Sequence, residues 1–289
     1  MKPILVHIHI FYPEMWKELR ECIKNIAPHP FDMFVTMVEE HSEIQTDIKN
    51  NFPSAKIEIV ENRGYDVAPF IHVLNQINLD DYSYVVKLHT KRDINKGPYF
   101  RNMQGSIWRD TLLSFISSKD MFNKYLEALK KDSQIGMQAN HKVIVHHDFY
   151  DEYANSEMKK WLKDNKFPHL KYAFVAGTMF IARASIFKDI KKLHLKINDF
   201  PATKGEHKTQ LAHIFERYLG YITYQNNMTV SDGILPRTQE EKYHRNIYIQ
   251  MRLIRPFIRL FYQKKITKSG KLCIKICKIP LPVNLFLRK

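Results

Sequence analysis

Two polar segments, each following an apolar run, contain the residues best suited to bind a charged ligand. Residues 61–66 read Glu-Asn-Arg-Gly-Tyr-Asp, and residues 89–93 read His-Thr-Lys-Arg-Asp. Lysine and arginine can neutralise phosphate charge, and neutral imidazole is a common metal ligand. Open α/β sheets bind ligands beyond the carboxyl ends of their strands, so two parallel strands would bring both segments to one site. The alternative is that a basic strand end is simply solvated.

Both segments supply candidate ligand-binding residues. Gly64 lets the chain turn and leaves room for a ligand close to the backbone. Arg63 could contact a base or a phosphate. Asp66 could accept hydrogen bonds from a ligand, cap the helix that follows, or do both. The full candidate set is Asn62, Arg63, Gly64, Asp66, His89, Thr90, Lys91 and Arg92.

The pattern around these segments predicts strands that alternate with helices. Apolar runs of strand length occupy residues 4–10, 31–38, 56–60 and 84–88, and stretches with helical periodicity lie between them. Such alternation predicts a mostly parallel sheet with right-handed crossovers. The expected fold class is therefore α/β, with a Rossmann-like, mostly parallel sheet flanked by helices.

The second half of the chain is expected to complete this sheet. Residues 141–171 are polar, with little periodicity beyond a helix near 156–163, and are typical of an insertion or lid over the sheet edge. Residues 172–183 predict either a strand pair or one strand bent at Gly177. The remaining predicted elements are helices over 108–116, 121–129, 185–193 and 209–218, and strands over 136–139 and 221–224.

The basic charge of the chain is concentrated at its C-terminal end. The 289 residues carry a formal charge of +15. Residues 242–289 contain 13 of the 45 lysines and arginines and none of the 30 acidic residues, which leaves 32 basic against 30 acidic residues elsewhere. We therefore expect a nearly neutral domain over 1–236 and a basic segment over 237–289. The pI of about 9.5 then describes the tail rather than the fold.

The basic segment predicts a membrane-surface helix. Apolar residues alternate with arginines over 245–261, a composition typical of an amphipathic helix on anionic lipid. The alternatives are a helix packed on the domain, or non-specific nucleic-acid binding, for which no recognition motif is found. The cysteines form no disulfide or zinc pattern, and neither a signal peptide nor a membrane-spanning run is recognised. The expected location is cytoplasmic, peripherally associated with the inner face of the cell membrane.

Several motifs, taken in order, resemble the rhamnan synthesis protein F family. They are NRGYDVAPF, VVKLHTKR, Trp108-Arg109, VAGTMFIAR, and DFP followed by LAHIFER. The arrangement Asn-x-Gly, then an Asp and a helix, then a buried strand is also similar to that of GT-A glycosyltransferases. The resemblance covers roughly residues 1–230. It implies a GT-A-like glycosyltransferase that helps to build bacterial surface polysaccharides.

The chain departs from the family pattern at three places. Tyr65 stands where the family has a second arginine, and 208–210 read Lys-Thr-Gln where Asp-Gly-Thr is often found. His89-Thr90-Lys91 occupies the place of the Asp-x-Asp metal motif of most GT-A enzymes. A divalent cation, Mg²⁺ or Mn²⁺, therefore stays open as a cofactor, with His89 as its candidate ligand. Lys91 and Arg92 could instead neutralise a diphosphate without a metal.

The resemblance also implies roles for residues of the second half. The donor would be a dTDP- or UDP-linked sugar, bound by the eight residues named above. Inverting transfer needs a group that takes the proton of the acceptor hydroxyl, and Glu216 and Asp199 are the candidate catalytic residues. A surface pairing of Glu216 with Arg217 or Lys208 is the alternative. The candidates for binding the sugar or acceptor are Gly177, Thr178, His213 and Trp108, each of which could instead serve packing or a bend.

The expected function is transfer of a sugar from a nucleotide donor to a lipid-linked or growing surface glycan. L-rhamnose is the first candidate for that sugar, with inversion at the anomeric carbon. The expected partners are the donor, the lipid-linked acceptor and an anionic membrane surface contacted through 242–289, with no specific nucleic acid. The alternative from another class is a catalytically silent module of the same fold that binds glycan or lipid.

Overall fold

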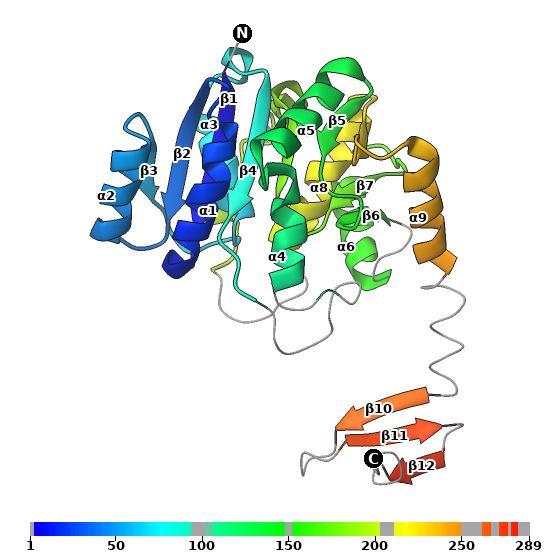
Figure 1. Cartoon of the computed structure of the whole chain (residues 1–289). Coiled ribbons are helices and arrows are strands. Elements are labelled where there is room, and N and C mark those ends of the chain that lie inside the picture. The colour runs from blue at the N-terminus through cyan, green and yellow to red at the C-terminus, as the bar shows by residue number, and fades with distance from the viewer. Residues whose placement is uncertain are drawn as a thin grey trace. The chain divides into compact units, whose positions relative to one another are not determined.

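The computed structural model describes residues 3–93, 103, 106–147, 152–202 and 211–249, and three strands between 262 and 282. For 152–155 and the three C-terminal strands it describes the backbone alone. The chain divides into two compact units, Met1–Pro236 and Arg237–Lys289 (Figure 1).

A seven-stranded, mostly parallel sheet forms the centre of the first unit. Its strand order is β3-β2-β1-β4-β8-β5-β9, and Figure 1 shows the first four of these strands, from β3 to β4, in that order. All pairings are parallel except those of β8, which runs antiparallel to both of its neighbours. The expected Rossmann-like α/β architecture is therefore confirmed. The strands are β1 (Ile4–Ile10), β2 (Phe31–Met37), β3 (Lys56–Ile59), β4 (Tyr84–His89), β5 (Ile135–Gln138), β8 (Phe180–Arg183) and β9 (Thr229–Ser231).

The central strands are buried along their whole length. Every residue of β1 and of β4 is buried, although both contain charged or imidazole side chains. Helices cover both faces of a sheet of this kind, so its strands consist largely of Val, Ile and Leu. A polar side chain in such a strand needs a partner, because an unpaired polar group loses its hydration without compensation.

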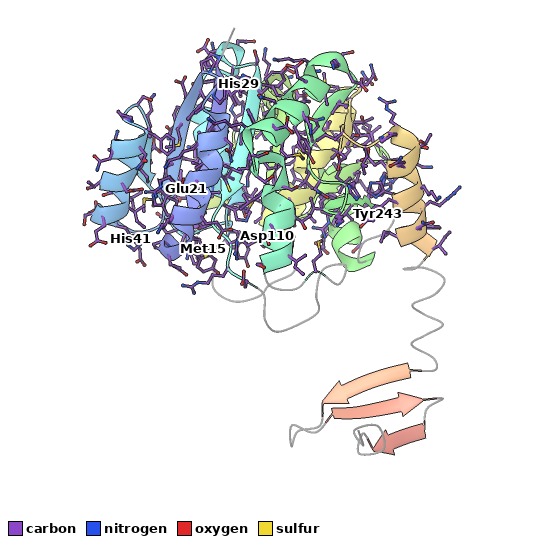
Figure 2. All side chains as sticks on the ribbon, viewed as in Figure 1. Met15, Glu21, His29, His41, Asp110 and Tyr243 are labelled. Carbon is purple, nitrogen blue, oxygen red and sulfur yellow. The ribbon has the colours of Figure 1, made fainter. Side chains whose placement is uncertain are left out.

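Two layers of helices enclose the sheet. Helix α3 packs on β1 and against α7 and α8, whereas α5 packs against the 3-10 turn that follows α1. Figure 1 shows α1 and α3 on opposite faces of the first strands. Exposed side chains such as Glu21 on α1 lie on the outer side of these layers (Figure 2). The helices of the first unit are α1 (Trp16–Ile23), α2 (Ser42–Asn51), α3 (Val67–Gln76), α4 (Ser106–Leu113), α5 (Lys119–Lys131), α6 (Glu152–Asp164), α7 (Lys188–Lys191) and α8 (Leu211–Gln225).

Helix α8 crosses very close to the strand β7 (Ala173–Val175). A Cβ atom at Gly220 would lie 2.3 Å from the carbonyl oxygen of Ala173 and 2.5 Å from the Cα of Phe174. Such distances are far shorter than van der Waals contact, so only glycine fits at this crossing. This packing positions the first half of α8 beside the turn at Gly177.

The predicted closing strand over 221–224 is wrong, because these residues belong to α8. The last strand of the sheet is β9, four residues beyond the end of that helix. Tyr221 to Tyr224 have aromatic and β-branched side chains that favour strands, but this preference is weak and tertiary packing overrides it. Phe215, Tyr218, Leu219 and Ile222 recur at helical spacing and are all buried. The helix predicted over 185–193 is likewise shorter, a 3-10 turn over Ala184–Phe187 followed by α7.

Residues 172–183 form two strands rather than one bent strand. Strand β7 pairs antiparallel with β6 (Ile144–His146) in a separate two-stranded sheet, and β8 belongs to the large sheet. The segment 141–171 thus contributes a strand, and Val143, Ile144 and Val145 in it are buried. The helix expected near 156–163 is α6. Whether the segment acts as a lid stays a prediction.

The second unit begins with α9 (Arg237–Ile249) and contains a three-stranded antiparallel sheet. Its strands are β10 (Tyr262–Ile266), β11 (Leu272–Ile276) and β12 (Ile279–Pro282). The tail was expected to be helical, and the helix found covers only its first part; residues 250–261, which carried most of the predicted amphipathic pattern, lie outside the described residues. Among the described residues, no helix is long and apolar enough to cross a bilayer.

Candidate functional site

The order in which the chain adds strands to the sheet reverses between β1 and β4, although the two strands are parallel. The chain adds β2 and β3 on one side of β1 and then places β4 on the other side. In doubly wound sheets the crevice at such a switch point is where ligands bind. At this point His9 pairs in register with His89, and His7 with Lys87. Polar side chains of two buried neighbouring strands therefore meet directly below the expected site.

Lys87 is the centre of this polar group, and its side chain has no exposed surface. Its ammonium donates to Asp66 Oδ2, to the Thr178 carbonyl at 3.1 Å and to Thr178 Oγ1 at 3.1 Å. An ammonium has three donors, so all of them are satisfied. The Thr178 hydroxyl in turn donates to Asp66 Oδ2. Strand β4, the start of α3 and the turn before β8 are thereby joined through one ion pair, of which the lysine is fully buried and the aspartate partly buried.

Asp66 precedes α3, but its carboxylate makes no capping hydrogen bond to that helix. Burial alone would raise the pKa of Asp66; the neighbouring His89, the charge of Lys87 and the hydrogen bonds from Lys87 and Thr178 outweigh burial and lower this pKa strongly. Burial also lowers the pKa of the Lys87 ammonium, and the charge of Asp66 opposes this shift. The carboxylate is therefore ionised at neutral pH.

Two further histidines share one hydroxyl beneath this pair. His7 Nε2 and His9 Nδ1 each lie 3.0 Å from Thr36 Oγ1 on β2. Burial lowers the pKa of His9 to about 4 and that of His89 to about 3, and it lowers the pKa of His7 well below its ordinary value. All three imidazoles are therefore neutral at physiological pH. We call the whole group the buried polar cluster: His7, His9, Thr36, Asp66, Lys87, His89 and Thr178.

Gly177 and Thr178 form a tight turn beside this cluster. Both have positive φ angles, 83° and 50°. The Gly177 N–H donates to Glu216 Oε1 at 2.9 Å, and Glu216 Oε2 lies 3.9 Å from His213 Nδ1 on the same face of α8. Burial would raise the pKa of Glu216, but His213, Arg217 and the Gly177 N–H together lower it. The structure thus holds a second ionised carboxylate next to Thr178.

Lys91 lies just beyond the end of β4, with its ammonium 4.3 Å from the centre of the Trp108 ring. This distance is within cation–π range. Burial lowers the pKa of Lys91, and the negative charges of Asp66 and Glu216 oppose that shift. The three charged groups are therefore close enough to influence one another. They were predicted to share a site, and the structure brings them together with Thr178, His213 and Trp108.

Thr90 has a structural role at the same strand end. Its hydroxyl oxygen accepts hydrogen bonds from the backbone N–H groups of Phe11 and Tyr12, both at 2.9 Å. It fixes the chain leaving β1 against the end of β4. Tyr65 occupies the position where the family has a second arginine. It has a positive φ of 55°, and its ring centre lies 5.5 Å from that of His213.

The guanidinium groups of both candidate arginines bind protein groups instead. Arg63 donates to Glu61 at 2.6 Å and to the Phe200 carbonyl at 3.0 Å. Arg92 is exposed, donates to Glu14 and stacks over the Tyr12 ring at 4.4 Å. Because both guanidinium groups are already bound by other protein groups, the structure gives no support to the phosphate contacts predicted for these two side chains.

Gly64 is required by packing as well as by conformation. Its φ is +60°, and a Cβ there would lie 2.6 Å from the Ala68 Cβ and 2.7 Å from the Phe200 ring. Asn62 is exposed. Asp199 is exposed too, and its carboxylate accepts from the Lys196 N–H at 2.7 Å to close a 3-10 turn. Residues 203–210, which include Lys208, lie outside the described residues.

The cluster does not have the donor set of a metal site. Within the described residues, no group of three His, Cys, Asp or Glu side chains is arranged to hold a metal ion. Asp66 Oδ2 lies 3.5 Å from His89 Nδ1, but the same oxygen already accepts from Lys87 and Thr178. An ammonium at that position competes with a cation for the carboxylate. His89 is therefore better understood as part of the buried polar cluster than as a metal ligand.

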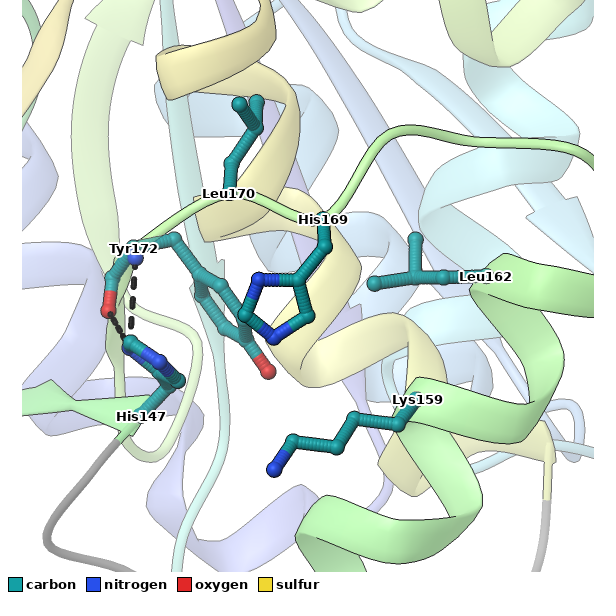
Figure 3. A pocket seen from close by; sticks show the side chains of 6 residues that line it. All are labelled: His147, Lys159, Leu162, His169, Leu170 and Tyr172. Atoms are coloured by element: carbon teal, nitrogen blue, oxygen red, sulfur yellow. Dashed lines mark hydrogen bonds between the residues drawn. The ribbon is translucent and has the colours of Figure 1, made fainter.

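A small pocket lies elsewhere, at the start of β7. Figure 3 shows His147, His169, Lys159 and Tyr172 around it, with Leu162 and Leu170 as apolar walls. His147 Nδ1 lies 3.1 Å from the Tyr172 carbonyl oxygen. The free volume of the pocket is about 10 Å³, which is room for about one water molecule. It is too small for a sugar nucleotide.

Lys87, His7, His9 and Thr36 lie at the candidate site, and the sequence analysis did not single them out. The available signal was a lysine or histidine at alternate positions of two otherwise apolar runs, ILVHIHI and YVVKLH. In a strand buried on both faces, such residues need partners. The register places Lys87 beside His7 on the neighbouring strand, but their hydrogen-bond partners are other residues, Thr36 for the histidines and Asp66 and Thr178 for Lys87.

The parallel sheet, its switch point and the charged groups above the buried polar cluster define a Rossmann-like α/β protein with a candidate ligand site at the carboxyl edge of the sheet. The family model of rhamnan synthesis protein F matches residues 1–228. The chain belongs to this family, which connects it with the synthesis of rhamnan and related polysaccharides.

Two curated relatives come from Xanthomonas campestris pv. campestris, strains B100 and ATCC 33913, and both are named "Uncharacterized protein WxcX". Each is 26% identical to this chain over 220 residues, which is 74% of this chain and 30% of the relative. The chain therefore spans less than a third of the length of these relatives.

Proposed function

We propose that the first unit is a GT-A-like glycosyltransferase. It transfers a sugar from a nucleotide donor to a lipid-linked or growing bacterial surface glycan. Membership of the rhamnan synthesis protein F family supports a role in polysaccharide synthesis. The observation that carries the proposal is the position of Lys91, a cation held over Trp108 at the switch point of the sheet.

Lys91 neutralises the charge of the donor diphosphate as the glycosidic bond breaks. A leaving diphosphate gains negative charge in the transition state, and a fixed cation there lowers the barrier. The Trp108 ring fixes the ammonium, and partial burial strengthens its charge interactions. Arg63 and Arg92, whose guanidinium groups are already bound by Glu61 and Glu14, do not enter this role.

The buried polar cluster gives the site its rigidity. The pair of Lys87 and Asp66 joins three elements at the floor of the site, so the site is preorganised before a ligand binds. The Gly177 N–H holds Glu216 beside Thr178. Glu216 is thereby placed to bind hydroxyl groups of a sugar, and it is the one of the two predicted catalytic carboxylates that this proposal keeps.

The remaining features of the proposal concern the substrates and the place of action. The donor is a dTDP- or UDP-linked hexose, with L-rhamnose as the first sugar to test because the family is named for rhamnan synthesis. The basic tail, with 13 Lys or Arg and no acidic residue over 242–289, supports a peripheral position on the anionic cytoplasmic face of the membrane, where a lipid-linked acceptor is found.

The substitution Lys91→Ala tests this function. A hydrogen bond to a charged group contributes about 1.5–3 kcal/mol, so we expect the variant to bind the donor about 10- to 100-fold more weakly. Binding is measured by calorimetry with a panel that includes dTDP-L-rhamnose, UDP-glucose and free nucleotides, each with Mg²⁺, with Mn²⁺ and with EDTA. Release of nucleotide diphosphate measures turnover on the same samples.

Lys17→Ala is the matched control, because Lys17 is exposed on α1. It should bind as wild type. If wild-type protein binds no nucleotide sugar and releases no nucleotide from any of them, the site is not that of a glycosyltransferase, and the silent glycan- or lipid-binding module is the better description.

A further inference from the structure

A histidine and an aspartate meet at the same edge of the sheet, away from the buried polar cluster. His141 follows β5, and Asp232 follows the parallel neighbouring strand β9. His141 Nδ1 lies 2.9 Å from Asp232 Oδ2, and the His141 N–H donates to the same oxygen at 2.8 Å. None of the motifs discussed above includes either residue.

The carboxylate of this pair is fixed and the imidazole is accessible. The Asp232 side chain is 5% exposed, and its Oδ1 accepts from the Ile234 N–H at 3.3 Å and the Leu235 N–H at 3.4 Å. The His141 side chain is 19% exposed. Burial would raise the pKa of Asp232, and the hydrogen bonds from His141 outweigh burial and lower it.

The turn that carries Asp232 packs closely against a side chain of β5. Gly233 has a φ of +73°, and a Cβ there would lie 1.8 Å from Gln138 Nε2. Gln138 is completely buried on β5. The turn therefore packs directly on the strand that leads to His141, and the two residues of the pair are held by the same piece of structure.

Strand register places the pair level with the end of β4, where Lys87 of the buried polar cluster lies. Val86 on β4 pairs with Ile181 on β8, Ile181 with Gln138 on β5, and Gln138 with Ser231 on β9. Val86 and Ser231 are therefore at the same level in the sheet, and so are the residues after them, Lys87 and Asp232. His141 lies three residues beyond Gln138, which is at the level of Val86. Strand β5 is two positions from β4, which corresponds to about 10 Å at the usual strand spacing.

A buried carboxylate bound to Nδ1 of a more exposed imidazole is the arrangement that orients a histidine base. The carboxylate selects the tautomer with the proton on Nδ1 and stabilises the imidazolium that forms. The other nitrogen, Nε2, is then the atom that takes a proton. A sugar attached to a diphosphate at the end of β4 would extend along the edge toward β5, where an acceptor hydroxyl would meet it.

We propose that His141 is the general base of the glycosyl transfer and that Asp232 is its positioning residue. This inference rests on the proposed function. The acceptor oxygen forms the new bond to the anomeric carbon while its proton passes to His141 Nε2. The bond from the anomeric carbon to the diphosphate oxygen breaks, and the nucleoside diphosphate leaves with the electron pair beside Lys91. The imidazolium then returns its proton to solvent.

Glu216 has a different role in this scheme. Its Oε1 accepts from the Gly177 N–H and its pKa is lowered, so it is a weak base that stays ionised. An ionised carboxylate at that place binds sugar hydroxyls. The two candidates for the base are therefore His141 and Glu216, and they can be separated experimentally.

Cleavage of the donor by water and by azide shows whether His141 or Glu216 is the base. Attack by water needs a base, whereas the azide anion has no proton to lose. With the donor of the panel that wild type hydrolyses fastest, we expect His141→Ala to lose about 10²- to 10⁴-fold in hydrolysis, the usual contribution of a general base. Addition of sodium azide should restore nucleotide release and yield the glycosyl azide. Asp232→Asn should lower kcat with little change in KM, and Asp232→Glu should recover part of the loss.

His72→Ala is the matched control, because His72 Nε2 lies 2.9 Å from Glu58 Oε2 in an imidazole–carboxylate pair on α3 and β3. It should hydrolyse the donor as wild type does. The inference is overturned if His141→Ala hydrolyses within about 3-fold of wild type, or if azide restores Glu216→Gln and not His141→Ala. Thermal melting of each variant verifies that it is folded. A wild-type protein that releases no nucleotide rejects the proposed function, and the role of His141 with it.

Discussion

Mild acid should destabilise the first unit through the histidines beneath its site. His9 and His89 are buried, with their pKa lowered to about 4 and about 3 from 6.5. Below pH 6.5 the unfolded chain takes up protons at these positions, while the folded chain does not until the pH approaches the lowered values. The unfolded state thus binds more protons, and stability falls as the pH drops from 6.5 toward 4.

The size of the effect follows from the two pKa values. At pH 5 an unfolded histidine is about 1.5 units below its pKa, and each unit corresponds to about 1.36 kcal/mol. Each of the two histidines therefore costs about 2 kcal/mol at pH 5, and His7 changes stability in the same direction. A loss of about 4 kcal/mol is a large part of the stability of a typical domain.

Urea unfolding at pH 7, 6 and 5 measures this loss. The three tryptophans, Trp16, Trp108 and Trp161, all belong to the first unit, so their fluorescence reports its unfolding. His9→Asn retains a side-chain amide near Thr36 but cannot titrate, and we expect its stability to fall by about 2 kcal/mol less than that of wild type between pH 7 and pH 5. His29→Asn, which removes a histidine outside the cluster, should keep the wild-type slope. Equal slopes for wild type and His9→Asn would refute the reasoning.

Three further substitutions test the packing and charges of the site. Lys87→Met leaves the partly buried Asp66 carboxylate without its cation, which should cost up to about 3–5 kcal/mol in urea unfolding; the double variant with Asp66→Asn should recover part of this loss. Gly220→Ala places a methyl group 2.3 Å from the Ala173 carbonyl oxygen and should lower stability by at least about 1–3 kcal/mol, whereas an unchanged melting temperature would contradict the close crossing of α8 and β7. Arg63→Ala should raise the proteolytic susceptibility of the segment around Phe200 while donor binding in calorimetry stays within about 3-fold, and a loss as large as that of Lys91→Ala would show that Arg63 binds the diphosphate after all.

The order and type of the first seven elements could be predicted because the sequence expresses them locally. Apolar runs of strand length are separated by helices with a clear apolar face, and each crossover is short. The prediction of a strand over 221–224 was wrong because contacts remote in the sequence decide the structure there. Tyr221 and Ile222 have strand-forming side chains, and the packing of Gly220 against β7, far away in the sequence, decides that they continue a helix.

The site, too, could be predicted only where the signal is local in the sequence. Lys91, Asp66 and Glu216 could be identified because polar groups at strand ends and on a helix face are visible in the sequence. The partners that occupy Arg63 and Arg92 could not, because Phe200 and Glu14 are remote in the chain. Lys87 was missed because a lysine in a strand is usually exposed, and its three acceptors come from positions 66 and 178.

The division of labour between strands and loops affects how such a protein can diversify. The groups that hold the floor of the site belong to β1, β2 and β4, or are locked to them by Lys87. The groups that would face a substrate, such as Tyr65, Lys91 and His141, stand on connections beyond the strand ends. Substitutions in these connections can therefore change substrate preference while the strands beneath them stay the same. Libraries that seek new sugar specificities should vary the connections and leave the strand residues unchanged.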